Sequence, residues 1–279
     1  MRVFEKVIEA NLIKLKRLGY DSIQTKTQYE KFRYKGDTTI TLYTSGKLTI
    51  AGKKENEEKA VKFLIAEKII KIIKQDYEYD FDSNDIYIGC DESLKGDTFG
   101  GICLSIFCAN KKIRKDLVEI GVKDSKKIID EKIIYMAKDI MKKYPDNYLT
   151  KSIEPYEYNI LTQSHNVTQL LNSVYKNMIL KLTSKFKINK IYVDKYPGAK
   201  IIGIENIIYL EKGESKIIEI AAASIISRYY ALKQIEKLNK KVNFYIPKGS
   251  THVKVALTEL KNKKLSKINF VKLHFRNTQ

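Results

Sequence analysis

In the stretch IYIGCDESLKGDTFGG, residues 86–101, an apolar pattern runs directly into two adjacent acids. Apolar residues alternate at its start, which predicts a strand, and Asp91 and Glu92 then stand side by side ahead of a loop that contains glycine. A carboxylate at the end of a buried strand is costly unless something compensates its charge. The stretch therefore predicts a strand end whose acids have a partner.

Two further acids occupy comparable positions. Asp194 closes the apolar strand KIYVD (190–194), and Glu214 precedes Ser215, which we predict to be the N-cap of a helix. Carboxylates that converge from strand ends and a helix start, with no histidine near them in sequence, favour hard divalent cations. A single strand-end Asp is more often a turn residue or a cap, so the inference depends on the set.

The composition favours a folded protein with a polyanionic partner. The chain has 279 residues, 43% of them hydrophobic, and a formal net charge of +19 from 52 Lys and Arg against 33 Asp and Glu. A metal site in so basic a protein suits phosphoryl transfer on a nucleic acid. A lysine-rich surface that arose by compositional drift would carry the same charge, so the charge does not decide between them.

Three cysteines lie close together in sequence without the C-x-x-C spacing of a zinc site, which predicts reduced, buried thiols in a cytoplasmic protein. The start of the chain, MRVFEKVIEANLIKLKRLGY, lacks the apolar run of a signal peptide. No stretch approaches the roughly 18 uncharged apolar residues of a membrane span. We expect no membrane partner.

The chain divides into two patterns. Apolar residues at helical spacing from Phe4 to Leu18, ended by Gly19, predict an amphipathic helix; alternating strands over 31–52 and a helix over 56–75 complete a small α+β unit. The acid-rich segment 76–85 is typical of a linker. Strands and helices then alternate, with helices expected over 130–144 and 167–184, which predicts an α/β or mixed layered domain. We predict domains over 1–78 and 86–279, joined by a linker over 79–85.

The second domain resembles a known family. The motifs GCDESLKGDTFGG (89–101), GVKDSKK (121–127), VDKYP (193–197), KGESK (212–216) with AAASIISRY (221–229), and KLHFRNT (272–278) resemble, in this order, those of ribonuclease HIII, a subgroup of type 2 ribonuclease H. The segment YKGDTTITLYTSGKLTIAGKK (34–54) is similar to the TATA-binding-protein-like domain that precedes the nuclease in that subgroup. The resemblance implies a ribonuclease H-like mixed sheet flanked by helices, preceded by a small α+β TATA-binding-protein-like domain.

The same resemblance implies an activity and its residues. A ribonuclease HIII hydrolyses the RNA strand of RNA–DNA hybrids with two Mg²⁺ or Mn²⁺ ions and leaves 5′-phosphate and 3′-hydroxyl ends. Asp91, Glu92, Asp194 and Glu214 then correspond to the catalytic, metal-binding acids. We expect Asp91 to bridge both ions from a rigid strand. Because successive strand residues face opposite ways, we expect the chain to turn directly after Asp91 to bring Glu92 to the same site.

The loop after the acids departs from the family pattern. In the family a glycine, a small or basic residue and a second glycine bring backbone to the ribose 2′-hydroxyl, and this chain has Leu94, Lys95 and Gly96. Leucine is disfavoured at positive φ, so we expect either that Leu94 is not left-handed or that the loop is shifted. For Lys95, a phosphate contact and a solvated turn position both fit.

Other positions match the family on the substrate side. Ser125 and Lys126 combine a helix cap with phosphate contacts, although capping alone explains the pattern. Asn159 and Asn177 match positions that line the substrate, without a role that the residues themselves reveal.

On the N-terminal unit, basic and aromatic side chains are expected to grip the hybrid backbone: Arg33, Tyr34, Lys35, Tyr43 and Lys47. We expect a cytoplasmic monomer that acts on RNA–DNA hybrids. Two alternatives stay open: a hybrid-binding protein with impaired catalysis, and ribonuclease HII-like cleavage at single ribonucleotides in DNA.

Overall fold

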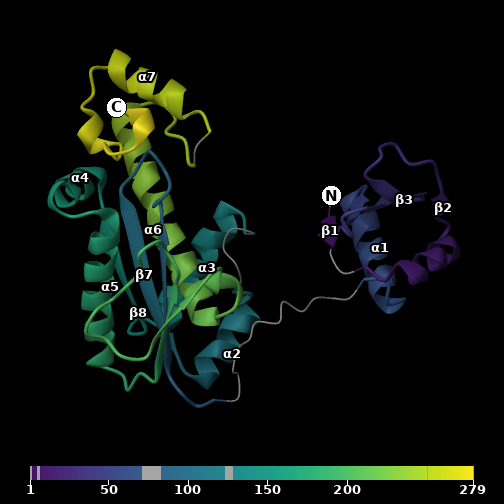
Figure 1. The fold of residues 1–279 in the computed structure, drawn as a ribbon, viewed down its shortest axis with the longest axis horizontal. Helices are drawn as coiled ribbons and strands as arrows, with labels where there is room; N and C mark the ends of the chain where they lie inside the picture. The colour runs from purple at the N-terminus through teal and green to yellow at the C-terminus, as the bar shows by residue number, and fades with distance from the viewer. Residues whose placement is uncertain (1, 5–6, 71–82, 123–127, 250, 279) are drawn as a thin grey trace. The chain divides into compact units, whose positions relative to one another are not determined.

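The computed structural model describes residues 2–4, 7–70, 83–122, 128–249 and 251–278. The chain forms two compact units, Met1–Lys74 and Gln75–Gln279 (Figure 1). Within the described residues, every helix is too short or too polar to cross a membrane.

The N-terminal unit is an antiparallel sheet with helices on one face. The strands lie in the order β1-β5-β4-β3-β2. Its elements are β1 (Arg2–Phe4), the 3₁₀ helix η1 (Glu9–Leu18), β2 (Asp21–Ser22), β3 (Glu30–Lys35), β4 (Thr39–Tyr43), β5 (Leu48–Ala51) and α1 (Lys54–Ala66). Alternate strand residues, such as Ile40 and Leu42, pack against Leu12 and Leu15 of η1. This α+β arrangement agrees with the TATA-binding-protein-like unit that the sequence predicts.

Local details of this unit differ from the predictions. The helix expected from Phe4 is wrong in extent and type, because Phe4 belongs to β1 and the helix is a 3₁₀ helix that begins at Glu9. Gly19 ends it in the left-handed conformation, as predicted, with φ 73°. The next helix ends at Ala66, and Gln75 lies outside the described residues. Apolar spacing located these segments but could not distinguish a 3₁₀ helix from an α-helix.

Two of the residues expected to grip the hybrid lie on opposite faces of this sheet. Tyr34 pairs with Ile40 and is buried in the core, whereas Arg33 pairs with Thr41 on the other face. Because side chains alternate along a strand, neighbours in sequence cannot share one face. Tyr34 therefore belongs to the core and not to the surface where it was expected.

The second unit is built on a mixed five-stranded sheet. The strand order is β10-β9-β6-β7-β8, with β7 antiparallel to β6 and β8, and β9 parallel to β6 and β10. Its strands are β6 (Tyr87–Ser93), β7 (Ile102–Ala109), β8 (Tyr148–Ile153), β9 (Lys190–Asp194) and β10 (Ile207–Leu210). Its helical segments are α2 (Lys111–Ile120), α3 (Asp130–Lys143), α4 (Pro155–Ser164), α5 (Val167–Thr183), η3 (Gly213–Ser215), α6 (Ile218–Val242), α7 (Val253–Asn262), η4 (Lys267–Asn269) and η5 (Arg276–Thr278). The predicted ribonuclease H-like mixed sheet flanked by helices is confirmed.

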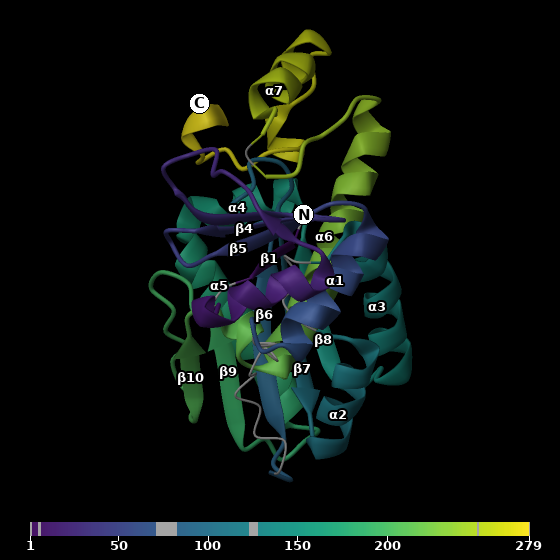
Figure 2. The ribbon, with the colours of Figure 1, turned by 90° about the vertical axis from the view of Figure 1, so that its right-hand side faces the viewer.

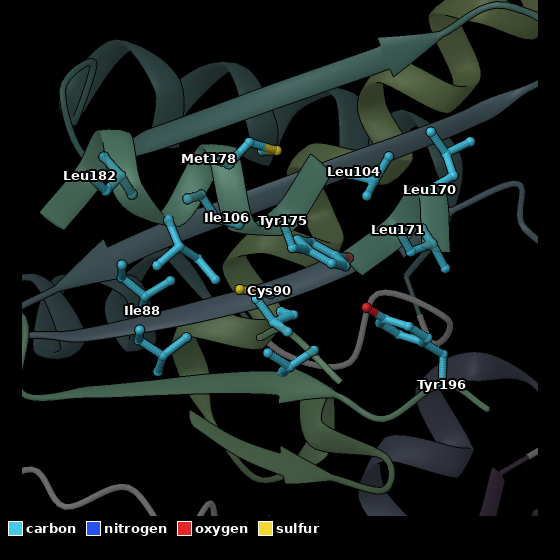
Figure 3. Close-up of a cluster of buried hydrophobic side chains, with 14 of the residues drawn as sticks. Ile88, Cys90, Leu104, Ile106, Leu170, Leu171, Tyr175, Met178, Leu182 and Tyr196 are labelled. Carbon is cyan, nitrogen blue, oxygen red and sulfur yellow. The ribbon is translucent and has the colours of Figure 1, made fainter. Parts of the chain in front are cut away.

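Each face of this sheet has its own apolar core. On one face, Ile88 and Cys90 of β6 pack against α5, and Figure 3 shows them beside Tyr175. On the other face, Phe107 of β7 packs with α2, α3 and the alanine run of α6. Figure 1 shows α5 to the left of β7 and α6 to the right, and Figure 2 views the sheet from the side of α6. The first core holds β6 from one side, and α6 lies against its other side, which fixes the direction in which its end points.

Helix α6 lies unusually close to β6. A Cβ atom placed on Gly89 would be 2.1 Å from both the carbonyl carbon of Glu219 and the nitrogen of Ile220. Only glycine fits there, because real Cβ atoms do not approach backbone so closely. The small residues Ala221, Ala222 and Ala223 are all fully buried at the same contact. The close approach sets Ser224 of α6 beside the end of β6.

A buried ion pair ties the start of α6 to the start of β6. Arg114 of α2 donates to Glu219 at 2.6 Å, and both side chains are almost fully buried. The guanidinium also donates to the carbonyls of Ser83, Asp85 and Ala109 and stacks on the ring of Tyr87 at 4.1 Å. Arg114 thus has a polar or aromatic partner on several sides, as a buried guanidinium requires.

Candidate active site

The four acids singled out in the sequence come from three elements of the second unit. Asp91 and Glu92 lie on β6, Asp194 ends β9, and Glu214 lies on η3. Asp91 and Glu214 are buried, with 8% and 3% of their surface exposed. The parallel pairing of β6 and β9 brings the carboxyl ends of both strands to one edge of the sheet.

Asp91 is the centre of the group. Burial is the largest cause that raises its pKa well above the ordinary value, and the carboxylates of Glu92, Asp194 and Glu214 raise it further. A hydrogen bond from Ser224 acts in the opposite direction. Since a like charge raises the pKa of an acid only from nearby, the four carboxylates form one electrostatic group.

The expected turn after Asp91 is wrong. Strand β6 continues to Ser93, and Glu92 pairs with Leu104 of β7. Asp91 therefore faces Ser224 of α6, whereas the Glu92 carboxylate accepts from the Tyr175 hydroxyl on α5 at 2.9 Å. Both acids still line one pocket, because that pocket surrounds the end of the strand. The error came from assuming that the site lies on one face of the sheet.

The remaining two acids are held by a sharp backbone turn. Lys212 adopts the left-handed conformation, with φ 55°, and the Gly213 N–H donates to Asp194 Oδ1 at 2.7 Å. The predicted N-cap role of Ser215 is wrong, because Ser215 ends η3 and its hydroxyl donates to the Lys212 carbonyl. Helix α6 begins three residues later at Ile218. Glu214 therefore lies in a tight turn ahead of the helix.

Three of the acids, Asp91, Glu92 and Asp194, border a pocket of about 560 Å³. Its lining also includes Asp130, Arg228 and Lys248. Asp130 accepts from Arg228 at 2.7 Å and also binds Lys248; although burial raises the pKa of Asp130, these two cations lower it below its ordinary value. The pocket is thus lined by cationic as well as acidic side chains.

The donor set fits divalent cations. Three carboxylates gathered around the buried Asp91 present, with it, the oxygen ligands that Mg²⁺ and Mn²⁺ prefer, and a cation would offset the repulsion that raises the pKa of Asp91. Within the described residues, no three acidic, histidine or cysteine side chains already surround a common point at ligand spacing. Glu92 is drawn toward Tyr175 and Lys95, and Asp194 toward Gly213, so metal binding requires their carboxylates to shift.

The loop after β6 answers the question about the conformation of Leu94. The first expected alternative is wrong, because Leu94 is left-handed, with φ 69°, and it lines the pocket beside the acids. The second alternative, a shifted loop, stays a prediction. Its carbonyl accepts from the Asp97 N–H at 3.1 Å and from the Lys272 ammonium at 2.7 Å. Strained backbone of this kind persists where surrounding contacts hold it in place.

Lys95 and Gly96 also line the pocket. The Lys95 ammonium lies 3.1 Å from Glu92 and 4.8 Å from the centre of the Tyr196 ring. It therefore meets an acid of the site. Gly96 is exposed, and a Cβ atom there would meet no heavy atom within 4 Å.

The other predicted substrate residues are dispersed. Ser125 and Lys126 lie outside the described residues. Asn177 is exposed on α5. Asn159 is buried on α4, where its amide donates to the carbonyls of Ile268 and Val271 and its oxygen accepts from the Leu273 N–H. The Asn159 side chain thus holds the C-terminal segment in place.

Three side chains that support the site were missed in the sequence. Tyr175 donates to Glu92, Ser224 hydrogen-bonds with Asp91, and Lys272 binds the loop after β6. Tyr175 falls within the apolar stripe of a helix and Ser224 ends a run of alanines, so both resemble core residues in sequence. A fully buried lysine has no local signal, because its partners lie about 175 residues away along the chain.

The mixed sheet, with acids meeting at its edge, defines the chain as a ribonuclease H-like protein. The family model for ribonuclease HII matches residues 88–278. Ribonuclease HIII of Lactococcus lactis subsp. cremoris (strain SK11) is 30% identical over 91% of this chain and 89% of its own length. Ribonuclease HIII of Bacillus velezensis is 34% identical over 86% of this chain and 83% of its own length. The chain belongs to the ribonuclease HIII family and is a ribonuclease H, a hydrolase that acts on RNA–DNA hybrids.

Solved structures agree with this family. Bst-RNase HIII, whose crystal structure contains Mn²⁺, superimposes with a TM-score of 0.64 at 26% identity, over 99% of this chain and 96% of the other. Aquifex aeolicus RNase H3 has a TM-score of 0.57 at 24% identity over 99% of this chain and all of the other, which supports the fold.

Proposed function

We propose that the chain cleaves the RNA strand of RNA–DNA hybrids at the acid pocket, with Asp91, Glu92, Asp194 and Glu214 as the ligands of two divalent cations, Mg²⁺ or Mn²⁺. The observation that carries this proposal is the environment of Asp91. It is a buried carboxylate whose pKa is raised by burial and by three further carboxylates. Such an arrangement is unfavourable for folding alone and favourable for binding cations.

Each acid has a distinct part in this proposal. Asp91 projects from β6, which is held between the core on the side of α5 and the helix α6, and it would be the ligand suited to bridge two ions. Glu92 and Asp194 approach from β6 and β9, and Glu214 approaches from the turn ahead of α6. When bound, the two ions activate a water molecule and stabilise the leaving 3′-oxygen of the RNA, which leaves 5′-phosphate and 3′-hydroxyl ends.

We assign recognition of RNA to the loop of Leu94, Lys95 and Gly96. Its backbone borders the same pocket as Asp91 and Glu92, so it lies beside the bond to be cleaved when the scissile phosphate sits at the acids. A backbone amide there can donate to the ribose 2′-hydroxyl, which DNA lacks. Lys95 neutralises part of the charge of Glu92 before substrate enters.

The N-terminal unit, taken as residues 1–78, is proposed to bind the hybrid backbone, with 79–85 as linker and 86–279 as the nuclease domain. The sheet face opposite the helices carries Arg33 and Lys35, and Tyr43 pairs with Glu30 on the same sheet. Such side chains contact phosphates and sugars without sequence preference. Replacing Lys35 and Lys47 by glutamine is expected to raise KM and weaken its dependence on salt, with kcat unchanged.

The proposed setting is the cytoplasm, with the chain acting as a monomer. Cys90, Cys103 and Cys108 are all buried and free of disulfides, which suits a reducing compartment. Sedimentation of the purified chain with and without hybrid tests the monomer.

Cleavage of an end-labelled RNA–DNA hybrid tests the proposed activity. Wild type is expected to cut the hybrid with Mg²⁺ or Mn²⁺, and Asp194→Asn is expected to bind the hybrid without cutting it. The products should carry 5′-phosphate and 3′-hydroxyl ends. Binding without cleavage by wild type would replace the proposal with a hybrid-binding protein.

A second substrate, duplex DNA that contains one ribonucleotide, separates the two nuclease alternatives. Preference for this duplex over the hybrid would replace the proposed activity with ribonuclease HII-like cleavage at single ribonucleotides. Equal protein concentrations and the same metal ion are used for both substrates, so that the ratio of kcat/KM reports specificity alone.

A further inference from the structure

The side chain of Lys272 is the most completely buried ammonium group among the described lysines, with 0% of its residue surface exposed. Its Nζ donates to the carbonyl oxygens of Leu94 at 2.7 Å, Asp97 at 2.5 Å and Gly100 at 3.2 Å. The rings of Tyr158 and Phe275 lie 5.5 Å from it. An ammonium has three N–H donors, and all three have a carbonyl from the loop between β6 and β7.

The C-terminal segment around Lys272 also binds this loop through other atoms. The Lys272 N–H donates to the Thr98 carbonyl at 3.0 Å, and the Gly100 N–H donates to the Phe270 carbonyl at 2.9 Å. Asn277 donates to the Thr98 hydroxyl at 2.8 Å. Asn159 holds the segment from its other side. The loop is therefore fixed to residues far away in sequence rather than to the strands that flank it.

The hydrogen bond from Lys272 to the Leu94 carbonyl also determines the direction of the N–H in the same peptide, that of Lys95. In a trans peptide the C=O of one residue and the N–H of the next point in opposite directions, and the described residues contain no cis peptide bond. Because the Leu94 carbonyl faces Lys272, the Lys95 N–H faces away from it. Leu94 and Lys95 both line the pocket, so this peptide lies at the pocket's edge.

We propose that Lys272 is the positioning residue for RNA recognition: by holding the carbonyls of Leu94, Asp97 and Gly100, it keeps Leu94 left-handed and aims the Lys95 amide at the ribose beside the cleaved bond. This inference rests on the proposed function of the loop and adds the residue that sets its orientation. Lys272 acts through the loop and does not touch substrate.

The energetics explain why a buried lysine belongs at this point. A left-handed leucine is strained, and the loop would relax if nothing opposed it. Three hydrogen bonds from one ammonium group oppose that relaxation. A glycine would remove the strain but would also free the loop to adopt other conformations.

Steady-state kinetics of Lys272→Met test the proposal at a pH below 7, where Lys272 is protonated because burial lowers its pKa only to about 7. The RNA–DNA hybrid is the substrate and a DNA duplex of the same sequence is a competitive inhibitor. We expect KM for the hybrid to rise at least tenfold while Ki for the DNA duplex stays unchanged, because only the 2′-hydroxyl contact is lost. The affinity for Mn²⁺, measured by calorimetry, should also stay unchanged. An unchanged ratio of Ki to KM in folded Lys272→Met would overturn the proposal.

Hydrogen exchange adds a structural readout that does not depend on cleavage. In wild type, the amides of Asp97 and Gly100, which donate to the Leu94 and Phe270 carbonyls, should exchange slowly for a surface loop, and Lys272→Met should accelerate that exchange at least tenfold. Fast exchange of these amides in wild type would contradict the proposal that Lys272 holds the loop. If wild type fails to cleave any hybrid, the proposed function fails, but the exchange experiment still reports on Lys272.

Lys267→Met is the matched control. Lys267 lies on the same C-terminal segment and donates to a backbone carbonyl, that of Thr278, at 2.8 Å. Its replacement should leave KM, Ki and loop exchange as in wild type; an equal effect would show that the segment is merely destabilised.

Should Lys272→Met fail to fold, Lys272→Gln takes its place as the test. Glutamine retains two N–H donors and is expected to keep part of the discrimination between hybrid and DNA. A folded Lys272→Gln whose loop exchanges faster than in wild type, and whose ratio of Ki to KM is lower, supports the proposal. Wild-type values of both quantities would contradict a need for the ammonium.

Discussion

Two buried carboxylates beside α6, Asp91 and Glu219, differ in what surrounds them. Glu219 is 1% exposed; burial raises its pKa, and the Arg114 guanidinium at 2.6 Å offsets part of that rise. Asp91 is 8% exposed and is surrounded by three more carboxylates that add to the effect of burial. Burial of an acid is therefore not a sign of function by itself. The acid that is suited to bind cations is the one whose neighbours add electrostatic repulsion to the cost of its burial.

The largest expected effect follows from neutralising the acid at the centre of the group. Asp91→Asn should lower kcat by about 10³-fold or more, because a lost metal ligand removes several kcal/mol of transition-state stabilisation. The free energy of unfolding without metal should stay the same or increase, since repulsion among the carboxylates falls. Single-turnover cleavage and urea denaturation measure the two quantities. A large loss of stability would mean that Asp91 and Glu219 do not differ as described.

Breaking the other pair should have the opposite result. Arg114→Met leaves Glu219 buried without its cation and should lower the free energy of unfolding by about 3–5 kcal/mol. Cleavage per folded molecule should not change, since the pair lies at the start of β6 and the acids at its end. Urea denaturation measures the first effect. The double variant Arg114→Met with Glu219→Leu should recover much of the stability, and a further loss instead would contradict the ion-pair explanation.

Stabilisation of the folded protein by metal ions should depend on Asp91 and not on Glu219. At a concentration about 100 times Kd, Mg²⁺ or Mn²⁺ should stabilise the folded state by about 2.7 kcal/mol. Thermal unfolding with and without the ion measures this shift. It should disappear in Asp91→Asn and persist in Glu219→Gln. An equal shift in both variants would place the ions elsewhere.

The pH dependence of stability extends the comparison to a buried cation. Burial lowers the pKa of Lys272 from 10.5 to about 7, against the attraction of Asp97 and Cys103. Above pH 7 the unfolded chain holds a proton that the folded chain has released, so the free energy of unfolding should rise with pH, by at most about 1.4 kcal/mol per unit. The difference in the free energy of unfolding between wild type and Lys272→Met, measured from about pH 7.5 to about pH 8.5, isolates this contribution.

The upper limit of that pH window has its own cause. Burial raises the pKa of Cys103 and Cys108 from 9.0 to about 11, so these thiols oppose the trend once unfolded cysteine begins to ionise. If the stability of wild type relative to Lys272→Met falls with pH before unfolded cysteine begins to ionise, the carbonyl partners of Lys272 outweigh its burial in setting its pKa.

The smallest expected effect is at Leu94. Leu94→Gly removes the strain of a left-handed leucine but also loses apolar contacts with Ile235 and Gly100, so stability should change by no more than about 1 kcal/mol. Hybrid cleavage should be preserved or improved, because Lys272 still holds the loop. Denaturation and kcat/KM measure the result. A large loss of cleavage would show that the leucine side chain itself contributes to the loop's arrangement.

The sequence predicted the fold class and the elements that carry the four acids because those signals are local. Alternating strands, helical spacing and the ordered motifs all lie within short windows. The motif resemblance also pointed to Asp91, Glu92, Asp194 and Glu214, which the structure joins in one electrostatic group. Their roles as metal ligands stay a prediction.

What could not be predicted depends on distance along the chain. The extension of β6 through Glu92 depends on pairing with β7, and the turn at Lys212 depends on contacts with Asp194. Tyr175, Asn159 and Lys272 acquire their importance from partners that are far away in sequence. Local patterns contain no information about such partners, so Leu94 could be identified as unusual but not explained.

Helix α6 connects these contacts through its length. Glu219 lies on its first turn, Ser224 and Arg228 follow at the pocket, and Gln234 accepts from the Gly101 N–H at 2.7 Å. Each residue of an α-helix advances by about 100° around its axis. Evolution can therefore substitute many positions in this helix, but the insertion or deletion of one residue would rotate everything beyond it. We expect the spacing between Glu219 and Gln234 to be constrained more strictly than the identity of most residues between them.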